Sequence, residues 1–503
     1  MTHHLALALV IACAALLVAA PARTGGLTGP ILPGVEVEIV DVVELPATSA
    51  SRPRARINGV QVPPDGSGRW FVNDLRGPLH LIDGATVSTY LDFAALFPAL
   101  KTSPGLASGF VSFAFHPDFA SNGIFYTVHS ETVGATPANL GPALPVAIVQ
   151  HSILTEFTAA DPAANVFAGS RRELMRIAAP HHFHNLGELA FDPTKAPGHP
   201  ERGLLYIGAG DFGSVAVGQP EQLQRLDTPF GAVLRIDPLG GPFVRDATTY
   251  FYGIPAGNPH AGDGDPDTFG EIFLHGVRNA HRLIFDPADA TLLLADIGQG
   301  NVEEIWPGAA GANGGWPARE GSFALDPETD PETVFPLPPF DPVHGYRYPV
   351  AQYDHDEGVA IAGGVIVHGG GVPELEGQLV FGDIMNGRLF YADVAALAAA
   401  DDGDPATTAP IRELRLRHGG EPTTLLAVAS ATLGHPSLPR ADLRLARGPA
   451  GEVYVLTKQD GYVRRLASIA RQVPALPGAA LPALIALLLA AGITAARTRS
   501  RWW

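Results

Sequence analysis

The chain has a single cysteine among its 503 residues, and that cysteine, Cys13, lies in an apolar segment near the N-terminus. A lone thiol cannot form a disulfide within the chain, and no C-x-x-C-H haem attachment motif is present. Zinc sites built on several cysteines are excluded for the same reason. The sequence also lacks a G-x-S-x-G elbow and a Walker-type glycine loop, so serine hydrolase and nucleotide-binding functions have no support.

Basic residues are scarce as well. The 33 Lys and Arg residues are outnumbered by 51 Asp and Glu residues, which gives a formal net charge of −18. Proteins that bind phosphate backbones need clustered Lys and Arg. The body of the chain contains no such cluster, so we expect no nucleic-acid partner.

Glycine and proline, by contrast, are abundant, with 57 and 46 residues, and predict many turns and few long helices. Between them a short unit recurs, in which a β-favouring strand is followed by a turn, commonly with proline, and a second strand. The unit is clearest at residues 184–211 and returns at 113–126, 283–296 and 443–456. A hairpin that recurs at long intervals predicts an all-β chain in a radial array such as a propeller.

Six strand-rich stretches lie between residues 35 and 467, and we therefore expect a six-bladed β-propeller over 35–467. A β-sandwich is the competing architecture, but its strands would be more evenly spaced. Segments 326–349 and 401–435 are predicted to be long connections, where function concentrates. The six stretches are 60–82, 110–154, 188–236, a fourth that begins near 272 and includes 292–305, 360–393 and 443–466.

Both ends of the chain predict export. Residues 1–22 resemble a secretory signal peptide, with an apolar run before an A-x-A cleavage pattern. At the other end, a linker at 468–478 precedes a nearly all-apolar segment at 479–496, predicted as a transmembrane helix, and a basic tail at 497–503 that would lie in the cytoplasm. The arrangement is similar to PEP-CTERM sorting tails, which are cleaved after export, and a permanent anchor is the alternative. Either interpretation predicts a periplasmic or cell-surface body that meets the membrane through this helix.

Three groups of residues could carry chemistry. His184 opens a strand, as either a general base or a structural histidine with its hydrogen bonds satisfied. Arg278 and Asn279 at a strand end could hold a planar anionic ligand through the guanidinium fork, or form a salt bridge and a turn cap. The glycine-rich turn 296–301, which leads to Glu303, offers carbonyls and carboxylates suited to Ca²⁺, or is a solvated hairpin turn. The acids at 263–267 are interpreted as a surface turn because the EF-hand pattern is incomplete.

Taken in order, the motifs resemble the glucose/sorbosone dehydrogenase family, whose members are six-bladed propellers that use pyrroloquinoline quinone. The resemblance extends over most of residues 60–466. It rests on HNLGELAF, LLYIGAGD, GAVLRIDPLG, YGIPAGNP, GEIFLHGVRN, ADIGQGNVEEI, NGGWPAREG and GPAGEVYVLTKQDG.

The resemblance implies a catalytic pair. His184 would be the general base that takes the proton of a sugar hydroxyl while a hydride moves to the quinone. Arg278 would neutralise the charge that develops on the quinone oxygen. The implied activity is that of an exported quinoprotein that oxidises an aldose or related sugar. Its electrons would pass to an external acceptor, since the chain has no haem motif.

The resemblance also implies residues that hold the cofactor and its metal ion. Asn279 matches a residue that contacts the quinone, and Arg444 lies near the place of an arginine pair that binds it. The carbonyls of Gly298 and Gln299 match those that hold Ca²⁺ against the cofactor, and Glu303 is predicted as a further metal ligand.

Four positions depart from the family pattern. Leu186 replaces a glycine, Ala280 replaces the proline after Arg-Asn, and Gln299 replaces a proline at the Ca²⁺ turn. Met385 falls near the place of a lysine, and the loss of that cation would weaken binding of a tricarboxylate. Relatives with the Gly-Gln variant include extracellular propellers similar to hedgehog-interacting protein. A non-catalytic propeller that binds carbohydrate or protein is therefore one alternative function, and a Ca²⁺-dependent lactonase is another.

Overall fold

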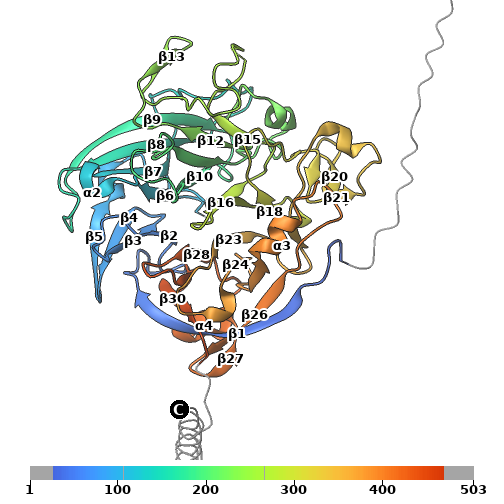
Figure 1. The fold of residues 1–503 in the computed structure, drawn as a ribbon. Helices are drawn as coiled ribbons and strands as arrows, with labels where there is room; N and C mark the ends of the chain where they lie inside the picture. Colours follow the sequence, from blue (N-terminus) through green and yellow to red (C-terminus); the bar gives the residue numbers. More distant parts are fainter. Residues whose placement is uncertain (1–25, 106, 266, 470–503) are drawn as a thin grey trace, which may run out of the picture.

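The computed structural model describes residues 26–105, 107–265 and 267–469 (Figure 1). The predicted signal peptide (1–22), the predicted transmembrane segment (479–496) and the basic tail (497–503) lie outside these residues, as does linker segment 470–478. Among the described residues, no helix is long and apolar enough to cross a membrane.

The described part of the chain is mostly β-sheet, which confirms the all-β prediction. Four antiparallel sheets of four strands each follow one another along the chain. The first comprises β2 (Ile57–Gln61), β3 (Trp70–Asp74), β4 (Pro78–Asp83) and β5 (Thr86–Asp92). The second comprises β6 (Phe110–Phe115), β7 (Ile124–Glu131), β8 (Gln150–Ala159) and β9 (Gly169–Ala179). The third comprises β10 (Leu186–Phe191), β11 (Leu205–Ala209), β12 (Ala232–Ile236) and β15 (Ile272–His275). The fourth comprises β16 (Ala280–Phe285), β17 (Leu292–Asp296), β18 (Val302–Pro307) and β22 (Ala351–Asp354).

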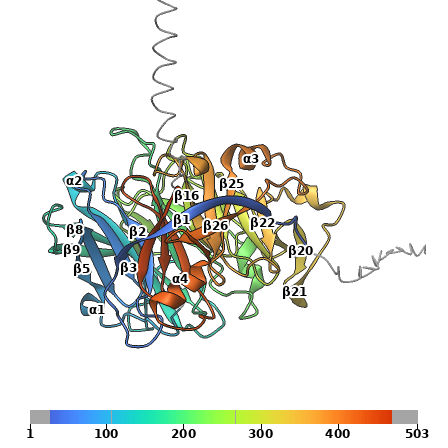
Figure 2. The same cartoon turned by 90° about the horizontal axis from the view of Figure 1, so that it is seen from below.

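The N-terminal strand β1 (Leu32–Glu44) joins two further groups of strands into one sheet of nine. It pairs in parallel with β26 and antiparallel with β30, so that it lies between them (Figures 1 and 2). One group contains β23 (Ile361–Ile366), β24 (Gln378–Asp383), β25 (Leu389–Asp393) and β26 (Arg412–His418), with β27 (Glu421–Thr423) beside β26. The other contains β28 (Leu443–Arg447), β29 (Val453–Thr457) and β30 (Tyr462–Ala467).

The first strand of each group lies toward the centre of the molecule. Strands β2, β6, β10, β16, β23 and β28 pack against one another in that order, and β28 packs against β2 to close the ring of described strands (Figure 1). The arrangement is propeller-like, with the strands of each group running outward from a central channel.

The remaining elements lie in the connections. They are the hairpin β13 (Phe243–Arg245) and β14 (Thr248–Tyr250), the small sheet β19 (Arg319–Glu320), β20 (Phe323–Asp326) and β21 (Asp330–Phe335), the helices α1 (Phe93–Leu96), α2 (Phe119–Asn122), α3 (Val394–Ala399) and α4 (Leu425–Thr432), and the 3₁₀ turns η1 (Pro220–Gln224), η2 (Asp341–His344) and η3 (Pro373–Leu375).

Two details of the predicted strand groups were wrong. The stretch that begins near Ile272 was assigned to the fourth group, but β15 pairs with β12 and completes the third. Only residues 276–279 separate β15 from β16, so no long loop marks the crossing between sheets. Segment 401–435 is not a plain connection, because it contains β26, β27 and α4. The charged residues that alternate with leucine in β26 gave it the composition of a surface loop.

The side chains of β1 that face inward anchor it to the core. Val37 and Ile39 are fully buried, and they pack in one cluster with Leu414 and Leu416 of β26 and Leu466 of β30. Since the strand also hydrogen-bonds on both sides, it contributes to closure through both packing and backbone pairing.

We predict that Ile39→Ala lowers the free energy of unfolding by about 2–5 kcal/mol, because it leaves a cavity where the ring closes. The same truncation at Val42, which is exposed on the same strand, should cost roughly 0.5 kcal/mol or less. Chemical denaturation of both variants measures the difference. Equal effects would show that β1 does not hold the ring through its buried face.

Candidate functional site

The innermost strands begin with irregular pairing. In five of the six described innermost strands the register against the next strand shifts near the start, which marks β-bulges in β2, β6, β10, β16 and β23. A bulge places one residue outside the regular alternation and redirects its side chain. Asn58, Val111, Gly187 and His281 lie at such shifts, and all four line the same cavity.

That cavity, called here the histidine cavity, occupies one end of the central channel. Its volume is about 520 Å³, and its lining comes from all six innermost strands or the turns just before them. Three predicted site residues line it, namely His184, Asn279 and Arg444. Met385, which the sequence resemblance places near a family lysine, lines it too.

A carboxylate orients His184. Nδ1 of His184 lies 2.9 Å from Oδ1 of Asp211, which also accepts the backbone N–H of Gly213 at 2.8 Å. Burial alone would raise the pKa of Asp211, but the neighbouring His184 and Arg278 lower it overall, so the carboxylate is ionised. An ionised carboxylate can only accept hydrogen bonds. The proton therefore sits on Nδ1 of His184, and Nε2 keeps its lone pair.

The backbone of His184 is held in an unusual conformation. Its φ of 56° is in the left-handed region, which costs a non-glycine residue about 1–3 kcal/mol. The carbonyl of His184 accepts the N–H of Phe212 at 2.9 Å, and a Cβ at Gly210 would lie only 2.4 Å from that carbonyl oxygen. The glycine of the LLYIGAGD motif is thus needed for the close approach of the two segments.

Arg278 lies beside this pair and joins it to the glycine-rich turn. The backbone N–H of Asp211 donates to the carbonyl of Arg278 at 2.7 Å. The Arg278 guanidinium donates to the carbonyl of Ile297 and to Oε1 of Gln299, both at 3.0 Å. Burial, and next the positive charge of Arg278, lower the pKa of His184 below its ordinary value. The imidazole is therefore neutral at physiological pH and able to accept a proton.

Asp296, at the end of β17, fixes the segment that carries Arg278 and Asn279. Its two carboxylate oxygens accept the backbone N–H groups of these residues at 2.9 and 2.5 Å. Burial raises the pKa of Asp296 to about 7, although the two amides and Arg278 favour the charged form. Asn279, whose backbone is fixed in this way, lines the histidine cavity.

The turn at 298–302 folds around one carboxylate oxygen. Oε1 of Glu320 accepts the backbone N–H groups of Gln299, Gly300, Asn301 and Val302 at 2.7–3.0 Å. Successive amides that converge on one anion form a nest. Among the described residues, the hydrogen-bond network gives the carbonyl oxygens of Gly298 and Gln299 no donor. Free carbonyls are the hard ligands that Ca²⁺ prefers.

Glu303 lies under this turn rather than in the histidine cavity. Its Oε1 lies 2.9 Å from Nε2 of His355, and its Oε2 accepts the N–H groups of Ile361 at 2.8 Å and Gly298 at 3.4 Å. Both oxygens are thus engaged within the protein. No group of three or more His, Cys, Asp or Glu side chains among the described residues could hold a metal ion. Any Ca²⁺ at this turn would be held mainly by carbonyl oxygens, and the assignment of Glu303 as a ligand stays a prediction.

Basic side chains form the floor of the histidine cavity. Both side-chain and backbone oxygens of Asn58 accept from them: Oδ1 from Nε of Arg444 at 3.0 Å and from Nζ of Lys458 at 2.7 Å, and the carbonyl from Nη2 of Arg282 at 2.8 Å. The stem of Arg282 passes so close to Gly363 (φ 81°) that a Cβ there would lie 2.0 Å from its Cγ. The basic residues that line the cavity are Arg56, Arg282, Arg440, Arg444 and Lys458.

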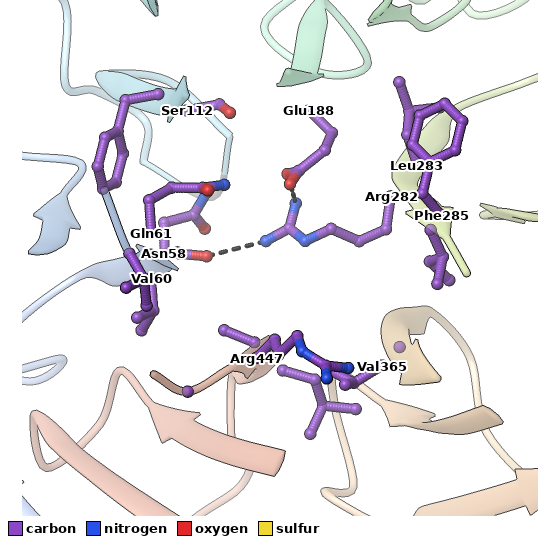
Figure 3. Close-up of a pocket in the computed structure, with 18 of the residues that line it drawn as sticks. Asn58, Val60, Gln61, Ser112, Glu188, Arg282, Leu283, Phe285, Val365 and Arg447 are labelled. Atoms are coloured by element: carbon purple, nitrogen blue, oxygen red, sulfur yellow. Dashed lines mark hydrogen bonds and ion pairs between the residues drawn. The ribbon is translucent and has the colours of Figure 1, made fainter. Parts of the chain in front are cut away.

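The same floor separates the histidine cavity from a second cavity at the opposite end of the channel. That cavity has a volume of about 460 Å³ and shares Asn58, Val111 and Arg282 with the first. Figure 3 shows Arg282 extending across it between Glu188 and Asn58, and its Nη1 lies 3.2 Å from Oε2 of Glu188. The ion pair and the Asn58 contacts therefore close the channel between the two cavities.

The structure brings His184, Asn279 and Arg444 to one cavity. Arg278, Gly298 and Gln299 are not part of its lining, but Arg278 donates to Gln299 and to the carbonyl of Ile297, and Ile297 lines the cavity. Sequence reasoning missed Asp211, Glu320, His281 and Lys458, and it included Asp296 in the glycine-rich turn without its role as acceptor for the amides of Arg278 and Asn279. Asp211 and Asp296 belong to motifs that were recognised, so their position after a strand was a usable signal. Lys458 carried no signal, because its role depends on Asn58 and Arg444, which lie 400 and 14 residues away.

Comparison with known proteins is consistent with this geometry. A family model described as "Glucose / Sorbosone dehydrogenase" matches residues 56–427, in agreement with the resemblance seen in the sequence. Among curated proteins, the chain is similar to the HIPL1 protein of Arabidopsis thaliana, with 27% identity over 360 residues, 64% of this chain and 50% of that protein. It is also similar to human hedgehog-interacting protein, with 28% identity over 237 residues, 46% of this chain and 30% of that protein. The chain spans about half the length of the HIPL proteins that it matches.

Solved structures with the same fold include two aldose sugar dehydrogenases. The soluble apo enzyme from Escherichia coli aligns with a TM-score of 0.59 and 18% identity, over 86% of this chain and 100% of that chain. The PQQ-bound enzyme from Streptomyces coelicolor aligns with a TM-score of 0.51 and 18% identity, over 86% of this chain and 99% of that chain. At such identities the likeness concerns the fold.

We predict that Glu320→Ala loosens the 298–302 turn, because four backbone donors lose their acceptor and each unsatisfied donor costs about 1–3 kcal/mol. Amide hydrogen exchange at residues 299–302 should become faster, and the free energy of unfolding should fall. Glu332→Ala is the matched control, since Glu332 contacts the side chain of Gln299 at 3.0 Å but is exposed. Unchanged exchange in Glu320→Ala would show that the carboxylate does not hold the turn.

Proposed function

The chain belongs to the glucose/sorbosone dehydrogenase family, and we propose that it is a sugar oxidoreductase that transfers a hydride from an aldose or related hydroxyl to pyrroloquinoline quinone. The six strand groups would then be the blades of a six-bladed β-propeller. The observation that carries the proposal is the pairing of a neutral histidine with an ionised carboxylate at the wall of a cavity whose other ionisable side chains are mostly basic.

The residues of the histidine cavity fit a flat, acidic cofactor. The cavity is large enough for a ligand of three fused rings, and its lining includes five basic side chains. The carboxylate of Asp442, the acidic residue of the described lining, is engaged by Arg440 and by Nε2 of Gln459. Basic groups thus remain available for carboxylates of the quinone. When bound there, pyrroloquinoline quinone would supply the electrophilic acceptor for the hydride.

The role of the chain in the reaction follows from the His184–Asp211 pair. Nε2 of His184 holds a lone pair next to the cavity and would accept the proton of the substrate hydroxyl. Asp211 keeps the imidazole in this tautomer and stabilises the positive charge that the ring gains. Arg278 lies at the edge of the site as a fixed cation, where it would stabilise negative charge that develops during the transfer.

The turn at 298–302 fits a Ca²⁺ ion through its free carbonyls. Gly298 and Gln299 would provide oxygen ligands, while the four amides bound to Glu320 fix the direction in which these carbonyls point. The ion would polarise the acceptor next to Arg278.

A non-catalytic function is the second candidate. It is supported by the similarity to hedgehog-interacting protein and the HIPL proteins and by Met385 in place of a cavity lysine. In this case the propeller would bind a carbohydrate or a protein without turnover. The two candidates differ in whether the protein reduces an electron acceptor when quinone and sugar are added.

We also propose that the protein acts outside the cytoplasm, with the sequence ends that predict export and membrane attachment as its support. Sugar oxidation there would deliver electrons to an external acceptor, since the chain itself has no haem motif.

We predict that His184→Ala lowers turnover by roughly 10²–10⁴-fold, because the proton acceptor is lost. Reduction of an electron-accepting dye by the purified protein, with pyrroloquinoline quinone, Ca²⁺ and a panel of aldoses, measures the effect. His199→Ala is a suitable control, because His199 is an exposed histidine outside the cavity lining. Full activity in His184→Ala would show that His184 is not the base. If the wild type reduces no dye with any of the sugars, the non-catalytic candidate is favoured.

The pH dependence provides a separate prediction. Activity requires neutral His184, whose pKa is lowered, so kcat/KM should stay constant as the pH falls through 6.5 and should decline only at lower pH. Asp211→Asn should reduce kcat by roughly 10²–10⁴-fold, because the tautomer is no longer fixed. It should also shift the acid limb of the kcat/KM profile to lower pH, since the carboxylate that raises the pKa of His184 is gone. An acid limb above pH 6.5 would contradict this assignment.

A further inference from the structure

Lys458, directly after β29, is one of three lysines in the chain and lies in the floor of the histidine cavity. We propose that Lys458 and Arg444 together form a carboxylate-binding site in this floor, and that the site takes up a proton when a carboxylate enters. The inference rests on the proposed function insofar as the natural occupant would be a carboxylate of the quinone. It assigns to Lys458 the role of the cation that the family resemblance leads us to expect near Met385.

Arg444 and Lys458 are buried without a counter-charge from the described residues. The exposed fractions of Arg444 and Lys458 are 7% and 4%. Neither cation forms a salt bridge with a carboxylate among the described residues; Lys458 donates to Oδ1 of Asn58, and Arg444 to that oxygen and its neighbouring carbonyl at Leu443. Buried charges are normally paired, because the loss of hydration costs several kcal/mol per ion. An amide oxygen shared by two cations does not supply a negative charge.

The nearby carboxylates are engaged elsewhere. Asp442 binds Arg440 and Gln459, and Glu188 binds Arg282 on the other side of the floor. No carboxylate of the described residues is therefore left to pair with them, and both side chains line a cavity that a ligand can enter. An ionised carboxylate suits the pair, because the guanidinium can donate two parallel bonds and the ammonium a third.

The two cations differ in how they respond to an empty site. Burial and the charge of Arg282 lower the pKa of Arg444 to about 9, so it remains charged at neutral pH. Burial, and next the charge of Arg444, lower the pKa of Lys458 well below its ordinary value, which favours the uncharged amine. The charged or titratable groups around Lys458 are Arg444, Arg282, His281, Asp442 and Asp74. Burial and the two arginines lower the pKa of Lys458, the carboxylates of Asp442 and Asp74 raise it, and His281 is itself uncharged, so an anion added beside the amine favours the ammonium form.

The proton linkage follows from this difference. A carboxylate next to Lys458 raises the pKa of the amine toward its ordinary value, so the protein binds a proton together with the anion. Affinity for the anion should fall as the pH rises, because binding is coupled to proton uptake and the proton concentration decreases.

The test is titration calorimetry on the purified full chain with benzene-1,3,5-tricarboxylate, a planar triacid that cannot be reduced like a quinone. Titrations in two buffers of different ionisation enthalpy measure the protons taken up. We expect binding with net proton uptake in the wild type. Lys458→Met should weaken binding by roughly 30-fold or more and reduce proton uptake. Lys458→Arg should keep the affinity within about tenfold but lose the uptake, since arginine stays charged.

Lys195→Met is the matched control, because Lys195 is a surface lysine paired with Asp192 and Glu201. Thermal unfolding confirms that each variant is folded. Equal affinity in the wild type and Lys458→Met, or no tricarboxylate binding by the wild type, would overturn the inference. Dye reduction with quinone and sugar is measured in parallel. Lysine-dependent tricarboxylate binding without dye reduction would refute the proposed oxidoreductase and leave the carboxylate site standing, whereas the reverse result would refute only the site.

Discussion

The N-terminal strand β1 hydrogen-bonds to β26 in parallel and to β30 in antiparallel fashion, and so ties the beginning of the chain to its end. The histidine cavity depends on this closure, because its lining comes from all six innermost strands. His184 is on the third strand group, Arg278 precedes the fourth, and Arg444 and Lys458 are on the last. If the last group moved away from the first, Asn58 would lose Arg444 and Lys458, and the floor of the cavity would open to water. Hydrated cations would no longer need a ligand, so the binding property proposed here is a consequence of the closed ring.

The stability of the ring and the chemistry of the cavity make opposing demands. Bulges at the start of five innermost strands interrupt the backbone pairing, the left-handed backbone of His184 is strained, and the basic side chains of Arg444 and Lys458 are buried without carboxylates. Each of these features is unfavourable for folding by itself. All of them adjoin the histidine cavity. The large apolar clusters of the strand groups, by contrast, are buried, and their burial offsets the local costs.

The sequence was sufficient for the all-β fold class and indicated three residues that line the histidine cavity, for reasons that differ from residue to residue. Short apolar runs punctuated by glycine and proline are local signals, and they located most of the strands that lie innermost or in the middle of each strand group. His184, Asn279 and Gln299 belong to contiguous motifs, so their resemblance to a family could be recognised without coordinates. Strand β1 was missed because its partners are more than 370 residues away, and β26 was missed because alternating charges resemble a loop. Lys458 could not be assigned for the same physical reason as β1, since its significance comes from Asn58 across the ring closure.

The departures from the family pattern affect the two halves of the site differently. The proton-accepting half is local: His184, Asp211 and Gly210 lie within 27 residues, and none of the departures touches the hydrogen bond between them. The proposed anion-binding half is assembled from distant segments, and here Met385 would replace a family cation while Lys458 would add one from the segment after β29. A cation can be moved in this way because attraction between charges in a water-poor cavity acts over several ångströms and needs no fixed hydrogen-bond angle. The direction of a proton transfer is less tolerant, since it requires one lone pair at one position. A cation that binds the anion can therefore come from a different side of the channel, whereas the base, His184, has to stay on the segment before β10 that positions its lone pair.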